Sequence, residues 1–384
     1  MSIEEYLNKK KNVQRVLLEY IEEESDAEEN YEIFIQVLED QQILEDIHEL
    51  RELLCLIIAV GNHHHRNKNF FSKIERILQH LKNKIIQYFT NTEIFSLFQK
   101  NKRLLLFLIE EKIMTVNEYF VAQIINDCFV QNKYVEYFAP EIKSFVTKEF
   151  IDKYCKKNRC LKNEEFIKEI KKAKQEDFYE KRKEGENENH LCELIRLQQT
   201  KEFIVQANKT NLQFTSCIPQ SIFETNRFFL NKNETKVIEY AAFYGSNEII
   251  KYMHNNGVEL MSSMWLYAIH SENAELIQYL EDNHISPPED SYDIVLKESI
   301  KCHQKDVSNY IINYLIKEED LQRIRKNIFY GNLYRYSVKY HNYYFFPGNL
   351  KHKYLFYYLC EFDYYTLVNL YLENMNIDIN ETII

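Results

Sequence analysis

The chain has 384 residues, of which 45% are hydrophobic and 28% are charged, and its formal net charge is −11. This length exceeds what one hydrophobic core usually serves, so we expect several domains or an elongated repeat array. The negative charge disfavours non-specific nucleic-acid binding, which requires clustered Lys and Arg. Only 6 glycines and 5 prolines are present, which favours an all-α fold over sheets with many tight turns.

The sequence from 1 to 90 reads as an N-terminal helical region, because its apolar residues recur at helical spacing. The strongest apolar face carries Leu50, Leu53, Leu54, Ile57 and Ile58. A turn at 61–67 and an acidic loop at 26–30 separate the expected helices.

Targeting and cysteine signals predict a cytoplasmic protein. The longest apolar run, Leu53–Val60, is too short for a bilayer, which needs about 20 residues. The acidic, polar N-terminus lacks the features of a signal peptide. The 8 cysteines are scattered and form no CxxC, so we expect small buried thiols in a reducing compartment.

A repeated unit becomes visible further along the chain, and its best copy is Tyr240–Glu259. A short helix is expected to end at Gly245, and a second helix to bury Ile249, Ile250 and Met253 before it stops at Gly257. The unit recurs at Tyr267–Ile285, with Glu275-Leu276-Ile277 in place of Glu248-Ile249-Ile250. Such self-similarity is typical of an α-solenoid, in which each helix pair buries its apolar face against its neighbours.

The pattern predicts four regions. Residues 1–90 form the N-terminal helical region, 91–165 hold degenerate helical pairs, 166–189 form a charged, exposed helix or linker, and 190–384 form the repeat region. Units in the last region are expected near 190–212, 235–260, 262–287, 292–316 and 353–380. The Tyr-rich stretch 332–352 is expected to be an insertion or a degenerate repeat that covers the solenoid.

The best unit resembles the ankyrin repeat. The family pattern A-A-x-x-G-H-x-E-[IV]-V-x-L-L-L-x-x-G-A-x-[IV] is followed at nine positions, namely Ala241, Ala242, Gly245, Glu248, Ile249, Ile250, Met253, Gly257 and Leu260. His254 and Val258 depart from it. Ser246 replaces the usual His, and the T-P-L-H-x-A opening is poorly kept. The linker at Lys181–Asn187 and the Tyr- and Asn-rich repeats also resemble expanded ankyrin-repeat families of trichomonad-type protists.

No constellation in the sequence predicts chemistry, so we expect no catalytic residue, no cofactor and no metal. Motifs for phosphate cradles, nucleophile elbows and HExxH zinc sites do not occur. The His63-His64-His65 cluster is expected in a solvent-facing turn, because adjacent His side chains diverge and zinc needs converging ligands. Cys302-His303 and the pair Cys155 and Cys160 are isolated in sequence. Trp265 is expected in the core.

The resemblance therefore implies a non-catalytic scaffold or adaptor, a monomer that binds an unknown protein partner and neither nucleic acid nor membrane. Partner contacts of ankyrin type would use the inter-unit loops near 231–236, 260–264 and 287–290. The candidate partner-binding residues are Asn233, Glu234, Lys236, Ser262, Ser263, Pro288 and Glu289. Two alternatives remain open, namely a structural subunit of a larger complex and an enzyme with an unrecognised site in the N-terminal helical region.

Overall fold

A computed structural model describes residues 1–23, 28–63, 69–126, 133–145, 147, 149–150, 176–232, 234–317, 319, 333–346 and 355–374. The chain forms two compact units: unit 1 combines 1–74 with 241–384, and unit 2 spans 75–240. The described residues are helical and contain no β-strand, with an isolated bridge between Cys217 and Lys236. No helix among them is both long enough and apolar enough to cross a membrane.

Unit 1 begins with three helices and a short 3-10 turn: α1 (Ile3–Glu22), α2 (Glu28–Asp40), η1 (Ile43–Glu45) and α3 (Ile47–Gly61). A capping box starts α1, since Ser2 Oγ accepts from the Glu5 backbone and the Glu5 carboxylate accepts from the Ser2 N–H. Asp46 caps α3 by accepting from the backbone of His48 and Glu49. Short polar residues thus fix where these helices begin.

The second part of unit 1 is a series of short helices. α16 (Val237–Phe243) crosses the boundary between the units, and the series that follows is α17 (Asn247–Asn255), α18 (Met264–Ser271), α19 (Ala274–Asp282), η4 (Pro288–Asp290), α20 (Asp293–Lys301), α21 (Lys305–Tyr310), η5 (Ile311–Leu315), α23 (Leu333–Lys339), η6 (Tyr343–Phe345), α24 (Leu355–Glu361) and α25 (Tyr365–Asn374).

One turn geometry recurs between paired helices. A residue with positive φ precedes a backbone N–H that bonds to the carbonyl five residues earlier, in the pairs Gln199 with Leu194, Ser246 with Ala241, Gln304 with Ser299, Asn342 with Ser337 and Tyr364 with Leu359. A related bond closes second helices at Leu212, Val258 and Ile285. It satisfies terminal carbonyls as a Schellman motif does. In the Tyr-rich stretch 332–352, His341 and Asn342 form this turn as well.

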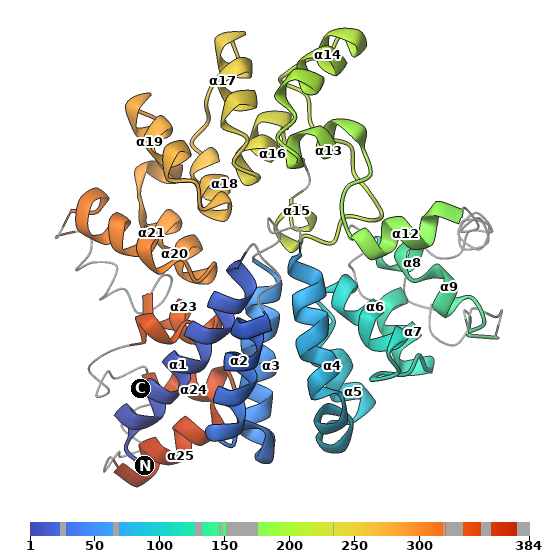
Figure 1. The fold of residues 1–384 in the computed structure, drawn as a ribbon, viewed down its shortest axis with the longest axis vertical. Helices are drawn as coiled ribbons and strands as arrows, with labels where there is room; N and C mark the ends of the chain where they lie inside the picture. Colours follow the sequence, from blue (N-terminus) through green and yellow to red (C-terminus); the bar gives the residue numbers. More distant parts are fainter. Residues whose placement is uncertain are drawn as a thin grey trace. The chain divides into compact units, whose positions relative to one another are not determined.

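Side chains join successive second helices of unit 1. Lys251 of α17 pairs with Glu275 of α19 at 2.8 Å, and His254 Nδ1 lies 2.6 Å from the Tyr279 hydroxyl. The Tyr310 hydroxyl of α21 donates to Glu281 of α19 at 2.9 Å. Helices α17, α19 and α21 therefore lie side by side, as Figure 1 shows.

The N-terminal helices of unit 1 pack on its C-terminal helices. Both α1 and α3 contact α25, and α1 contacts η6 (Figure 1). The buried Gln14 amide donates to Asn342 Oδ1 at 3.1 Å and accepts from the Tyr343 N–H at 2.7 Å. Segments from opposite ends of the chain thus share one core.

Unit 2 holds the rest of α4 (Phe70–Tyr88) and the helices α5 (Asn91–Phe98), α6 (Lys102–Glu110), α7 (Glu118–Asn126), α8 (Tyr134–Tyr137), α9 (Ala139–Ile142), α12 (Glu176–Glu184), α13 (His190–Arg196), α14 (Thr200–Thr210) and α15 (Arg227–Leu230). The expected charged helix exists as α12. The expectation that it is exposed is wrong at Arg182, which is 2% exposed and forms two 2.7 Å bonds to Glu141. Charge in the sequence did not reveal this partner.

Candidate functional site

The predicted partner-binding loops lie at the ends of the helix pairs. Glu234 is exposed and Lys236 is half-buried in unit 2, where the Lys236 N–H donates to Glu239 at 2.9 Å. Asn233 lies outside the described residues. In this loop the structure therefore offers one exposed carboxylate among the candidate contacts.

Two other predicted loops lie next to each other in unit 1. Ser262 and Glu289 are exposed, and Ser263 and Pro288 are half-buried. The buried Trp265 joins the loops, since its indole N–H donates 2.8 Å to the backbone carbonyl of the second loop at Ile285. The expectation that Trp265 belongs to the core is confirmed. A hydrogen bond from a buried ring thus links the segment after one loop to the segment before the other.

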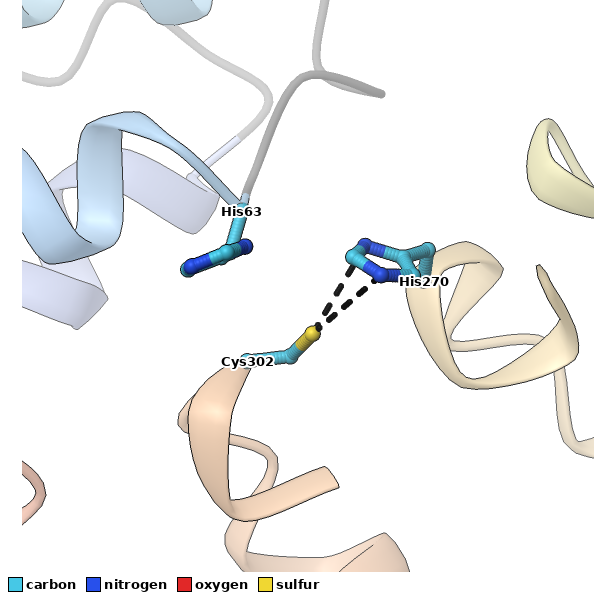
Figure 2. A group of neighbouring side chains, drawn as sticks. All are labelled: His63, His270 and Cys302. Carbon is cyan, nitrogen blue, oxygen red and sulfur yellow. Dashed lines mark hydrogen bonds between the residues drawn. The ribbon is translucent and has the colours of Figure 1, made fainter. Parts of the chain in front are cut away.

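A group of three potential metal ligands, absent from the sequence-based expectations, forms inside unit 1. His63 follows the end of α3, His270 belongs to α18, and Cys302 is the C-cap of α20. One ligand atom from each lies within 4.8 Å of the other two, and the residues are 6%, 1% and 0% exposed. Figure 2 shows the three side chains converging from separate segments of the chain.

The geometry of this group is tightest between Cys302 and His270. The sulfur lies 3.6 Å from His270 Nδ1 and 3.7 Å from Nε2 (Figure 2). His270 Nε2 lies 2.8 Å from Glu298 Oε1, and the ring also bonds to the backbone of His63. Burial lowers the pKa of His270, so the neutral imidazole is favoured. Although burial opposes it, Lys301 and the bond from His270 lower the pKa of Glu298 to about 2.

Aromatic rings enclose the same group. The Phe243 ring stacks on His270 at 5.0 Å between centroids, and Tyr340 meets His63 edge-on at 5.8 Å. The expectation that the three-histidine turn faces solvent is therefore wrong at His63, while His64 and His65 lie outside the described residues. Sequence spacing could not reveal the group, because its members come from three segments that only tertiary packing brings together.

The expectation of buried thiols holds for some cysteines only. Cys192 and Cys302 are buried, whereas Cys217 and Cys360 are exposed and Cys55 is intermediate. The remaining cysteines, Cys128, Cys155 and Cys160, lie outside the described residues.

A buried carboxylate pair lies in the N-terminal helical region. Lys10 Nζ lies 3.0 Å from Glu49 and 3.1 Å from Glu52, and the Tyr6 hydroxyl donates to both carboxylates. Burial raises the pKa of Glu52; for Glu49, burial also acts upward, but Lys10 and Tyr6 outweigh it and lower the pKa. Diverging pKa values occur in acid–base sites. Here, however, each carboxylate is held by partners from α1, so the pair acts as an internal cross-link between α1 and α3.

Unit 2 contains a second buried ionisable group beside a small cavity. Burial and the neighbouring Glu186 raise the pKa of Glu224 to about 8, and burial lowers that of Lys102 to about 7. Such shifts are common in active sites. The cavity that Glu224 helps to line measures about 50 Å³. Ligand pockets usually exceed about 300 Å³, so this one suits water rather than a substrate.

A larger, open cleft of about 440 Å³ lies in unit 1, lined by His48, Arg51, Leu359, Cys360, Asp363, Tyr364, Tyr365 and Val368. The His48 ring stacks on Tyr365 with 3.7 Å between centroids. This contact joins the start of α3 to the start of α25, and it leaves a cleft whose volume is in the range of small-molecule sites.

In comparisons with known proteins, no family model, no curated protein and no solved structure matches the chain.

Proposed function

We propose that the chain is a non-catalytic scaffold or adaptor, an α-solenoid of degenerate ankyrin-like repeats that binds a protein partner through its inter-unit loops. The observation that carries the proposal is the recurrence of one inter-helix turn, with the same five-residue backbone bond and the same positive φ. The turns lie between the two helices of a pair, so helix pairs of similar geometry would present their inter-unit loops at corresponding ends, as repeat proteins do when they build extended binding surfaces.

The loop edge of unit 1 is suited to this role. Ser262 and Glu289 expose polar side chains, while Trp265 holds the loops from below with its ring edge-on to Tyr292 at 5.2 Å. A rigid support lowers the entropy cost of binding, because the loops need not be ordered when the partner arrives. The acidic net charge favours a partner with a basic contact surface.

The test compares two double variants of the tagged full chain, each of which adds three positive charges. The measurement is proximity labelling in the protein's own cell. Ser262→Arg with Glu289→Lys alters the loop edge, and Gln278→Arg with Asp282→Lys makes the same charge change on the exposed face of α19. We expect the loop variant alone to lose specific neighbours, with circular dichroism unchanged in both. Equal labelling by all three proteins would refute the loop edge as the binding surface.

The alternative of an enzyme in the N-terminal helical region has one supporting feature, the cleft beside His48. A small-molecule library screened by thermal shift against the wild type and His48→Ala tests it. A ligand that stabilises only the wild type, and is turned over, would replace the scaffold proposal. The structural-subunit alternative predicts obligate co-purification with fixed stoichiometry instead of exchangeable partners.

A further inference from the structure

We propose that His63, His270 and Cys302 bind one Zn²⁺ ion, which forms a structural site in the core of unit 1. Imidazole nitrogen and thiolate sulfur are the ligand types that zinc prefers in proteins. The three residues are buried together, and their ligand atoms lie within 4.8 Å of one another. The site is independent of the proposed partner binding, since no loop-edge residue belongs to it.

The distances match a tetrahedral zinc centre closely at one edge. Zn–S bonds of about 2.3 Å and Zn–N bonds of about 2.0–2.1 Å place the sulfur and a nitrogen roughly 3.6 Å apart at a tetrahedral angle. Cys302 Sγ lies 3.6 Å from His270 Nδ1 and 3.7 Å from Nε2, so the sulfur lies against the ring and the imidazole would turn for Nδ1 to reach the ion. The longest separation in the group, at most 4.8 Å, exceeds a tetrahedral edge by about 1 Å. Rotation of the His63 side chain, which follows the end of α3, can supply this movement.

Glu298 provides the support that a metal-binding imidazole usually has. Ligating histidines commonly donate their second ring N–H to a carboxylate, which fixes the tautomer and orients the ring. Glu298 Oε1 lies 2.8 Å from His270 Nε2 and is itself held 2.7 Å from Lys301 Nζ. A neutral imidazole has a single N–H, so with Nε2 donating to Glu298, Nδ1 would be the nitrogen that binds the ion once the ring turns toward it.

Charge also favours a divalent cation at this point. A thiol that binds zinc loses its proton, so the Cys302 thiolate offsets one charge of Zn²⁺, and the Glu298 carboxylate, which also pairs with Lys301, lies beside the site. An ion in this position cross-links the end of α3 to α18 and α20, joining the two chain segments of unit 1. Three protein ligands leave the fourth tetrahedral position to another group such as water, an arrangement more common in catalytic zinc sites. We assign a structural role because all three side chains are buried, which keeps a substrate away from the ion.

The experiment measures zinc and cobalt binding by the purified full chain. We expect one equivalent of Zn²⁺ by elemental analysis, and Co²⁺ replacement should give a thiolate-to-cobalt charge-transfer band. Cys302→Ala should lose the band and stoichiometric zinc, whereas Cys360→Ala, which alters an exposed thiol, should keep both. Glu298→Gln should retain zinc with roughly 10- to 100-fold weaker affinity.

Because Cys302 is fully buried, His63→Gln provides a second ligand variant at a position that follows the end of α3. Loss of zinc from His63→Gln with an unchanged circular dichroism spectrum supports the site. Three results would overturn the proposal: no zinc in the wild type and no rise in its melting temperature on adding Zn²⁺, equal zinc binding by Cys302→Ala, or binding of Cu⁺ in place of Zn²⁺.

Discussion

The buried ion pair of Arg182 and Glu141 in unit 2 allows a strict comparison with its neighbour Lys181. Both cations belong to α12, and both pair with a carboxylate. Arg182 is 2% exposed at the side chain and its partner 15%, with two 2.7 Å bonds. Lys181 lies 3.1 Å from Asp177, with side chains 36% and 58% exposed. The two pairs therefore differ in burial, and Arg182 also donates to the backbone carbonyl of Tyr137 at 3.0 Å.

The expected losses in the free energy of unfolding on removing Arg182 or Lys181 differ about sixfold or more. Removing one partner of a buried pair costs about 3–5 kcal/mol, because it leaves an uncompensated charge. Since Glu141 keeps some exposure, we expect about 3 kcal/mol for Arg182→Met. The exposed i,i+4 pair contributes about 0.3–0.5 kcal/mol, so Lys181→Met should stay within that range.

Urea unfolding followed by far-ultraviolet circular dichroism measures the difference. With a slope of about 2 kcal/mol per M, Arg182→Met should lower the midpoint by about 1.5 M and Lys181→Met by less than about 0.3 M. Trp265, the single tryptophan, lies in unit 1, so its fluorescence follows the unfolding of that unit and provides an internal reference for changes made in unit 2. Equal midpoints for the two variants would show that the burial argument is wrong.

Three further predictions concern the repeat and the buried acid. Trp265→Phe should cost about 1–2 kcal/mol in thermal unfolding, because it keeps most of the buried ring but leaves the loop carbonyl without its donor. Gly245→Ala should destabilise the protein more than Gly257→Ala. Both glycines have positive φ, but a Cβ at Gly245 would lie 3.1 Å from the Asn273 amide, whereas a Cβ at Gly257 would meet nothing within 4 Å. Thermal melting curves of the two variants measure this difference. The folded-state pKa of Glu224, about 8, lies above the ordinary 4.5, so the folded state holds the proton more tightly and stability is lost as pH rises from about 4.5 to 8. Between pH 5 and 8, the free energy of unfolding of the wild type should therefore fall by more than about 1 kcal/mol relative to that of Glu224→Gln. Parallel plots of unfolding free energy against pH for the two proteins would contradict this.

The sequence by itself determined that the chain is helical and where the helix α17 begins and ends. Apolar spacing at Ile249, Ile250 and Met253 predicts a helix that buries one face, and all three are buried in α17. Gly245 and Gly257 mark its borders, and both adopt positive φ. These features are local, because helix periodicity and glycine conformations depend on residues within one or two turns.

Only the tertiary structure decided which distant groups meet. The segment with Arg182 has a composition typical of solvated helices, and nothing in its sequence points to Glu141. The same holds for His63, His270 and Cys302, whose separation along the chain gives no ligand spacing. In unit 1, packing of the N-terminal chain segment on the C-terminal one brings His63 to His270 and Cys302. The buried apolar contacts that drive such packing are non-directional, so they leave no motif in the sequence.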